Sequence, residues 1–302
     1  MSYLMEYHKP VLLQESISGL AIKPDGTYVD VTFGGGGHSR AILDHLDANG
    51  RLYAFDQDQD AQANHIPDER FTLIPHNFRY IKRHLRFHGL SKVDGILGDF
   101  GVSSHQFDVA ARGFSTRFDG KLDMRMDQKA TLSAHTIINT YDEEVLKSLF
   151  WKYGEVRMAP KLARAIVTAR KESPIHTNEQ LKEILMPFLP KKKAFKMLAQ
   201  IFQAIRIEVN QELEVLKEFL QQTMQLLNPG GRLSLISYHS LEDRLVKRFM
   251  RNGLFEGESE KDIYGHVDVP FKKIGKLIIP QEEELQVNNR SRSAKLRIAE
   301  RI

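Results

Sequence analysis

The sequence predicts an α/β protein whose parallel sheet is interrupted by an inserted all-helical domain. From Thr27, short runs of β-forming residues alternate with amphipathic segments as far as about residue 104, the pattern of parallel strands joined by crossover helices. The alternation resumes only near Val209, after a stretch in which every periodic segment is helical. We therefore expect a sheet-containing domain from residues 1–104 and 200–302 and an inserted domain from residues 105–199.

Three strands are predicted before the insertion. They carry the sequences TYVDVTF, RLYAFDQD and VDGILGDFGVS, at residues 27–33, 51–58 and 93–103, with helix-like segments between them. After the insertion, apolar residues from Val209 to Leu227 recur at steps of three and four and predict a helix, which NPGG ends. RLSLIS then predicts a strand, and SAKLRIAER alternates basic with apolar residues, as in an antiparallel or edge strand.

The insertion begins with an irregular segment. Residues 105–130 show no sustained period, and long ordered loops are often functional. Between Tyr141 and about Leu198 all periodic segments are helical: Asp142 is placed to cap one helix, and Thr177 with Gln180 forms a capping-box pair ahead of another.

Composition excludes several classes of protein. A chain of 302 residues that is 41% hydrophobic is long enough for a full core. It contains no cysteine, which rules out disulfides, thiolate metal ligands and a thiol nucleophile. The first residues do not resemble a signal peptide, and no apolar run is long enough to span a membrane. We expect a soluble, cytoplasmic protein with no membrane partner.

Basic residues gather in the insertion. The whole chain has a net charge of +4, but Trp151–Arg206 holds twelve basic residues against four acidic ones, a net charge of +8. Such clusters bind the phosphates of nucleic acids, although a solvated helix face is the alternative. The candidate RNA-binding residues are Lys191, Lys192, Lys193 and Lys196, with Arg290 and Arg292 near the C-terminus.

The stretch DVTFGGGGHSRAIL, from Asp30 to Leu43, places four glycines between a strand and a helix. Glycine tolerates positive φ and has no Cβ, so this turn lets backbone amides approach a ligand; a tight turn without a ligand is the alternative. The next strand leads to Asp56, about twenty residues after Gly36, where a carboxylate can accept both hydroxyls of a ribose. The pattern predicts a cofactor that contains a nucleoside.

Other cofactor classes fit the turn less well. No Lys-Ser or Lys-Thr follows the glycines, which excludes a P-loop, and Ser39 stands where a dinucleotide fingerprint carries its third glycine. A dinucleotide-dependent oxidoreductase and a non-catalytic RNA-binding scaffold are kept as alternative functions.

Further polar residues end the other strands. Asp99 ends the third strand, and Tyr238 and His239 follow RLSLIS, so all three belong to the edge of the sheet at which open α/β folds bind ligands. Asp99 could instead cap the next segment, and a single histidine after a strand is more often structural than catalytic.

Nine motifs, taken in order, resemble those of the bacterial methyltransferases that modify N4 of the cytosine at position 1402 of 16S ribosomal RNA. They are VDVTFGGGGHS, AFDQD, GDFGVSSHQFD, RGFS, LDMRM, YGEVR, FQAIRIEVNQEL, NPGGRLSLISYHSLEDR and RSRSAKLRIAER. The resemblance covers nearly the whole chain and implies a Rossmann-like class I methyltransferase fold that uses S-adenosylmethionine. The family often has Gly-Arg-Gly-Gly and LDL where this chain has Gly-Gly-Gly-Gly and GDF.

The resemblance also implies site residues. By motif, the cofactor contacts fall on Gly36, Gly37, His38, Asp56, Phe78, Asp99 and Gln106. Asp99, Tyr238 and His239 are the catalytic candidates, although Asp99-Phe100-Gly101-Val102 stands where many N-methylating enzymes carry Asp-Pro-Pro-Tyr.

The expected chemistry needs a hydrogen-bond acceptor and no metal. The exocyclic amine of cytosine is a poor nucleophile because its lone pair is delocalised, so Asp99 or a backbone carbonyl would hold its hydrogens. The base must leave its stack, and Phe100 and Tyr238 are candidates to hold its faces unless they belong to the core. The implied partner is 16S ribosomal RNA within the small ribosomal subunit.

Overall fold

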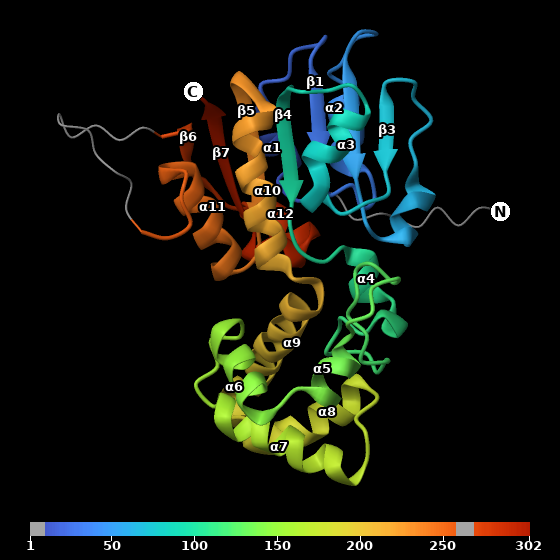
Figure 1. Cartoon of the computed structure of the whole chain (residues 1–302), viewed down its shortest axis with the longest axis vertical. Coiled ribbons are helices and arrows are strands. Elements are labelled where there is room, and N and C mark those ends of the chain that lie inside the picture. The colour runs from blue at the N-terminus through green and yellow to red at the C-terminus, as the bar shows by residue number, and fades with distance from the viewer. Residues whose placement is uncertain (1–9, 258–268) are drawn as a thin grey trace. The chain divides into compact units, whose positions relative to one another are not determined.

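The computed structural model describes residues 10–257 and 269–302 (Figure 1). The chain forms two compact units, one from Met1–Gly101 with Leu213–Ile302 and the other from Val102–Glu212. The boundary expected between residues 199 and 200 falls inside helix α9, Ala194–Asn210, which belongs entirely to the second unit. This helix cannot be divided there because its apolar face, with Leu198 and Ile205, packs in the helical core.

The first unit contains a seven-stranded sheet in the order β3-β2-β1-β4-β5-β7-β6. The first five of these strands are parallel to one another, and β7 is antiparallel to both of its neighbours. The predicted α/β class with a Rossmann-like sheet is therefore confirmed. The strands are β1 Thr27–Asp30, β2 Arg51–Phe55, β3 Phe71–Ile74, β4 Val93–Asp99, β5 Leu227–Ser237, β6 Phe271–Ile278 and β7 Lys295–Arg301.

Two strands of this sheet were not predicted. The strand β3 has only four residues, and β6 carries exposed lysines at positions where a buried strand would be apolar. SAKLRIAER, which contains β7, was expected to be antiparallel or at an edge; β7 is antiparallel but lies between β5 and β6. The edge strand on this side of the sheet is β6. Its Lys272 and Lys273 face solvent, which hinders pairing with a further strand.

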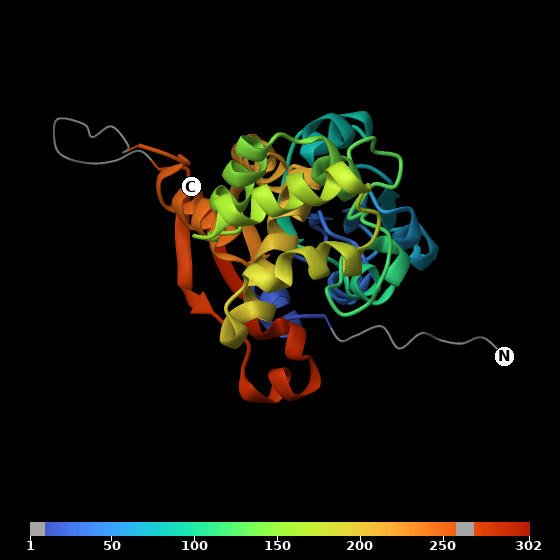
Figure 2. The same cartoon turned by 90° about the horizontal axis from the view of Figure 1, so that it is seen from below.

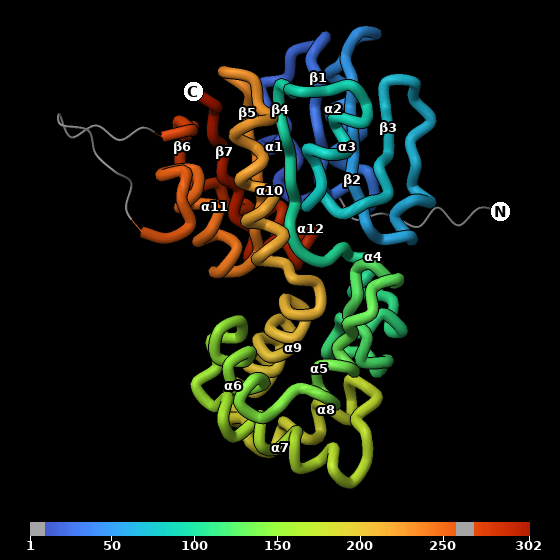
Figure 3. The backbone as a smooth tube through the Cα atoms, viewed as in Figure 1, coloured from blue at the N-terminus to red at the C-terminus, as the bar shows by residue number. Residues whose placement is uncertain are grey.

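Helices cover both faces of the sheet. On one face, α3, α10 and α11 bury apolar side chains in a common core around Phe219 (Figure 1). The other face is covered by α1 and α2, with Leu20 and Ile42 in a separate core. Figure 3 follows the chain from β3 through α3 back to β4. The helices are α1 Leu13–Leu20, α2 Gly37–Leu43, α3 Ile81–Phe87, α10 Glu212–Leu226, α11 Ser240–Asn252 and α12 Glu282–Val287, with 3-10 turns η1 Gln59–Asn64, η2 Phe78–Tyr80 and η6 Asn289–Ser293.

The second unit is helical, as predicted (Figure 2, green to gold). The capping box of Thr177 and Gln180 is present at α8, whereas Asp142 occupies the N-cap of α6 without a capping hydrogen bond. The elements are α4 Ser104–Asp108, α5 Ala134–Thr140, α6 Glu143–Lys152, α7 Ala159–Glu172, α8 Asn178–Leu185 and α9, with 3-10 turns η3 Ala110–Arg112, η4 Met186–Phe188 and η5 Lys191–Lys193.

The irregular segment between α4 and α5 is ordered by a buried cation. The side chain of Arg112 donates hydrogen bonds to the carbonyl oxygens of Arg125 and Met126, at 3.0 and 3.3 Å. Asp123 in turn forms an ion pair with Arg125, at 2.7 Å. Polar contacts thus order this segment, which lacks the apolar periodicity of a helix or a strand. Across residues 10–257 and 269–302, no helix combines the length and the apolar character needed to cross a membrane.

Candidate functional site

The glycine turn after β1 contains glycines for two different reasons. Gly34 and Gly36 have φ values of +50° and +76°, which L side chains rarely adopt. A Cβ at Gly34 would meet no described atom within 4 Å, so the backbone there is open to a ligand. Gly37 has an ordinary backbone, but a Cβ on it would lie 2.1 Å from Cγ of Pro10. The open position is therefore Gly34, whereas a Cβ at Gly36 would lie 2.9 Å from the Phe33 ring and the N-terminal segment requires Gly37. The cofactor contacts expected at Gly36 and Gly37 stay predictions.

Asp56 connects this turn to the end of β2. One carboxylate oxygen accepts a hydrogen bond from the backbone N–H of Gly34 at 2.8 Å, and the other accepts one from the N–H of Asp58 at 2.8 Å. Burial raises the pKa of Asp56 to about 6, although both hydrogen bonds favour the charged form. Each oxygen keeps a second lone pair that can accept a hydroxyl of a ligand.

Asp30, which the sequence did not single out, connects the groups at this edge of the sheet. Asp30 ends β1 and is fully buried. Its carboxylate accepts hydrogen bonds from Ser39 Oγ at 2.7 Å and from the backbone N–H of Thr32 at 3.0 Å, and burial raises its pKa. The hydroxyl of Thr32 also accepts a hydrogen bond from the N–H of Asp99 at 2.6 Å. A carboxylate at the end of an otherwise apolar strand was the signal available in the sequence.

Asp99 ends β4 at the same edge. Its Oδ1 accepts a hydrogen bond from the hydroxyl of Tyr238 at 2.8 Å. Burial raises the pKa of Asp99 to about 6, against the opposing effects of His38 and Tyr238. The alternative that Asp99 caps the next segment is not observed, because Ser103 caps α4 in a capping box with Gln106.

His38 lies in the first turn of α2 and is buried. Its Nε2 lies 3.1 Å from the carbonyl oxygen of Val11, an acceptor that assigns the hydrogen to Nε2. Burial lowers the pKa of His38, while the carboxylate of Asp99 acts in the opposite direction. His38 is therefore neutral near pH 7 and fastens the N-terminal segment to the glycine turn.

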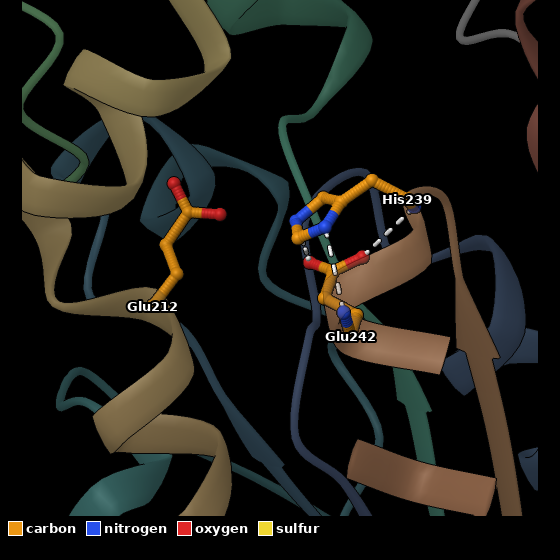
Figure 4. A group of neighbouring side chains, drawn as sticks. All are labelled: Glu212, His239 and Glu242. Atoms are coloured by element: carbon orange, nitrogen blue, oxygen red, sulfur yellow. Dashed lines mark hydrogen bonds and ion pairs between the residues drawn. The ribbon is translucent and has the colours of Figure 1, made fainter. Parts of the chain in front are cut away.

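The residues after β5 differ in their roles. Tyr238 directs its hydroxyl to Asp99, and its own pKa is raised well above the ordinary value by burial and by that carboxylate. His239 is the N-cap of α11, and its Nδ1 accepts a hydrogen bond from the N–H of Glu242 at 3.4 Å (Figure 4). Glu242 in turn accepts a hydrogen bond from the N–H of Tyr238 at 3.0 Å. These contacts give His239 a structural role, and its catalytic role stays a prediction.

The predicted aromatic residues differ in how deeply they are buried. Phe78 is partly buried, and its ring centroid lies 5.8 Å from that of Phe100 and 5.3 Å from that of Phe219. Phe100 is only 5% exposed and belongs to the core on this face of the sheet. Of the two alternatives that the sequence left open for Phe100, its burial favours the core over a flipped base. Gln106 is buried in the second unit.

The predicted RNA-binding residues are on the surface. Those near residue 191 lie in the second unit, in η5 and the first turn of α9, and those near residue 290 lie in η6 of the first unit. All six side chains are exposed: Lys191, Lys192, Lys193, Lys196, Arg290 and Arg292.

The model of the MraW methylase family matches residues 5–302. The chain belongs to this family. A relative named ribosomal RNA small subunit methyltransferase H, from Christiangramia forsetii, is 68% identical over 302 residues, the full length of both chains. A relative of the same name from Flavobacterium johnsoniae is 65% identical, again over the full length of both. A solved rRNA methylase from Streptococcus thermophilus is far more distant, with 12% identity, a TM-score of 0.43 and 95% of each chain covered.

Membership of the MraW methylase family confirms the resemblance that the motifs indicated. The chain is a methyltransferase, and the oxidoreductase and scaffold alternatives do not fit this family. S-adenosylmethionine is the cofactor that the family implies, and the residues present fit it. The open backbone at Gly34, the free lone pairs of Asp56 and the half-buried ring of Phe78 suit a nucleoside with a charged tail.

The raised pKa of Asp99 predicts a pH-dependent gain in stability for Asp99→Asn. The pKa is about 6 in the folded protein against 3.8 for an ordinary aspartate. Folding is therefore coupled to proton uptake between pH 3.8 and pH 6, and stability falls as the pH rises through this range. At pH 7 the neutral amide should raise the free energy of unfolding by about 1 to 3 kcal/mol. At pH 4 the gain should nearly vanish, as measured by urea denaturation.

Asp68→Asn is the matched control for this experiment. Arg70 lowers the pKa of Asp68 to about 2, so this substitution should reduce stability at pH 7 rather than increase it. An equal gain for Asp99→Asn at both pH values would contradict the assignment.

Proposed function

We propose that this protein transfers a methyl group from S-adenosylmethionine to N4 of the cytosine at position 1402 of 16S ribosomal RNA, in the small ribosomal subunit and in the cytoplasm. The observation that carries this proposal is Asp99, a carboxylate of raised pKa at the ligand-binding edge of the sheet, in a chain that is 68% identical over its full length to a ribosomal RNA small subunit methyltransferase. The sheet edge supplies the geometry and the relatives supply the substrate class.

The first task of the site is to hold the cofactor. When bound, S-adenosylmethionine supplies an electrophilic methyl group on its sulfonium. Asp56 would accept the ribose hydroxyls, and the turn at Gly34 and Gly36 would bring backbone amides close to the rest of the molecule. Asp30, through Ser39 and Thr32, fixes the position of this turn relative to Asp99.

Asp99 is the group suited to act on the substrate amine. A hydrogen-bond acceptor beside the amine turns its lone pair away from the ring and toward the methyl group. A pKa of about 6 places Asp99 close to the operating pH, where a general base is most effective. Oδ1 is held by Tyr238 at 2.8 Å, so its partner oxygen Oδ2 is the one we assign to the amine hydrogen.

The base and the rest of the RNA need separate contacts. A cytosine must leave its stack to reach Asp99, and Tyr238 is the aromatic residue that remains beside it now that Phe100 is placed in the core. The phosphates are assigned to Lys191, Lys192 and Lys193, with Lys196, Arg290 and Arg292 as further contacts. Productive transfer then depends mainly on alignment of the reacting atoms.

Asp56→Ala should weaken the binding of S-adenosylmethionine by about 1 to 3 kcal/mol, because it removes the acceptor of the ribose hydroxyls. Isothermal titration calorimetry measures this directly. Asp68→Ala, which removes a carboxylate paired with Arg70 elsewhere in the same unit, should leave the affinity unchanged. Equal losses in the two variants would show that the effect is not local.

Methyl transfer to small subunits or to 16S ribosomal RNA should yield N4-methylcytidine, identified by mass spectrometry of digested RNA. Asp99→Ala should lose nearly all turnover, and Asp99→Asn most of it, because the amide fills the site but carries no negative charge. His239→Ala should cost less than Asp99→Ala, since His239 caps a helix. A methyl group on a ring carbon, a ribose oxygen or another base would refute the proposed chemistry.

Replacement of Lys191, Lys192 and Lys193 with alanine should weaken RNA binding and flatten its dependence on salt, because fewer counterions are released. The affinity for S-adenosylmethionine should stay the same. Lys272, Lys273 and Lys276 on β6 allow a control triple variant with the same change in charge. An unchanged slope of log affinity against log salt in the first variant would move the phosphate contacts elsewhere.

A further inference from the structure

Helix α3 and the residue that precedes it carry an exposed stripe of two aromatic residues and a cation. Arg83 and Phe87 are four residues apart in α3 and therefore lie along one side of the helix. Tyr80, the last residue of η2, is the N-cap of α3, three residues before Arg83. Tyr80 is 50% exposed and Phe87 is 84% exposed, and Arg83 is also exposed. We call these three residues the α3 stripe. The opposite side of the helix holds Ile81 and Leu85, which are buried in the core, so the fold does not need the α3 stripe.

The surroundings of the α3 stripe are strongly basic. Residues 78–90 contain four arginines or lysines and two histidines, with no aspartate or glutamate. Arg79 is paired with Glu218 at 2.8 Å, and Lys82 contacts Gln225. Within residues 10–257 and 269–302, neither Arg83 nor Arg86 forms an ion pair. Two exposed guanidinium groups therefore remain available to an anionic partner.

The composition of this surface selects one kind of partner. Single exposed apolar residues are ordinary on a protein surface, but two aromatic rings with guanidinium groups between them match the alternation of bases and phosphates in an unpaired nucleic acid strand. Bases stack on aromatic side chains, and arginine binds phosphate. An acidic peptide would satisfy the guanidinium groups but would leave the flat faces of Tyr80 and Phe87 without a matching surface.

The α3 stripe also begins close to the site described above. Tyr80 follows Phe78 by two residues, and Phe78 packs against Phe100 at the end of β4. From there α3 runs back along the sheet toward the start of β4 (Figure 3), so the stripe extends about 10 Å away from the site at 1.5 Å per residue. That length corresponds to a few nucleotides of an extended strand.

We propose that the α3 stripe, with Arg86 beside it, binds an unpaired segment of the RNA substrate: bases stack on Tyr80 and Phe87, and Arg83 and Arg86 bind phosphates. This proposal rests on the proposed function, because it assumes that RNA is the substrate. It adds a further RNA-contacting surface on the sheet-containing unit, besides Arg290 and Arg292 there and the lysines of the second unit.

Substitutions at Phe87 separate stacking from simple apolar contact. The affinity of the full-length protein for a fluorescently labelled oligoadenylate is measured by fluorescence anisotropy. Phe87→Ala and Phe87→Leu should each weaken binding by about tenfold, within the range found for removal of one stacking residue, whereas Phe87→Trp should bind at least as tightly as the wild type. Thermal unfolding should be unchanged in all three, because the side chain is 84% exposed.

Arg83→Gln tests the phosphate contact on the same helix. The slope of log affinity against log salt should become shallower by about 0.7, the value for one contact to a single strand. Lys276→Gln is the matched control, since it removes one positive charge from an exposed position on β6, and Val287→Ala, at a position on α12 that is 71% exposed, is the control for Phe87→Ala. Both controls should leave the affinity and the slope unchanged.

The enzymatic readout distinguishes this proposal from the proposed function. With small subunits as substrate, Phe87→Ala should raise KM severalfold at unchanged kcat. If the wild type methylates RNA but Phe87→Ala and Arg83→Gln bind oligoadenylate normally, the α3 stripe is not an RNA surface and the proposed function stands. If Phe87→Leu retains full affinity, stacking is overturned. If the wild type neither binds nor methylates RNA, the proposed function itself fails.

Discussion

The buried carboxylate of Asp30 is the interaction on which the site depends. It lies at the end of β1, the strand in the middle of the parallel part of the sheet, and its hydrogen bonds reach α2 through Ser39 and β4 through Thr32 and the N–H of Asp99. Burying a charged carboxylate costs free energy unless hydrogen-bond donors surround it. The donors that satisfy Asp30 are therefore the same groups that set the distance between the glycine turn and Asp99.

A second constraint acts on the glycine turn from outside the sheet. Pro10 packs against Gly37, and the carbonyl of Val11 binds His38. The turn is thus fixed by Asp56 and Asp30 on one side and by the N-terminal segment on the other. Because the protein already supplies these contacts, the turn is preorganised, and less conformational entropy is lost when a ligand binds.

The sequence predicted much of the fold because its periodic segments are unambiguous. Strands β1, β2 and β4, the helical insertion and the Thr177–Gln180 capping box all follow from local patterns. The features that the sequence could not predict depend on contacts between residues that are distant in the chain. The division at residue 212 depends on which core α9 joins, the burial of Phe100 depends on Phe219, and the need for glycine at position 37 depends on Pro10. For Asp99 and Tyr238, the sequence indicated a shared edge, and the structure added the hydrogen bond between them.

The pairing of β4 with β5 has a consequence for how the chain folds. These strands are neighbours in the sheet, yet the whole segment Val102–Glu212 is made between them. The entropy of closing a loop grows only slowly with its length, by about 0.6 kcal/mol for each doubling, so the insertion costs little stability. The folding rate is affected more, because folding is slower when contacts join residues that are far apart in the sequence. Until β5 is synthesised, the side of β4 that pairs with it is an unpaired edge, and such edges are prone to aggregation.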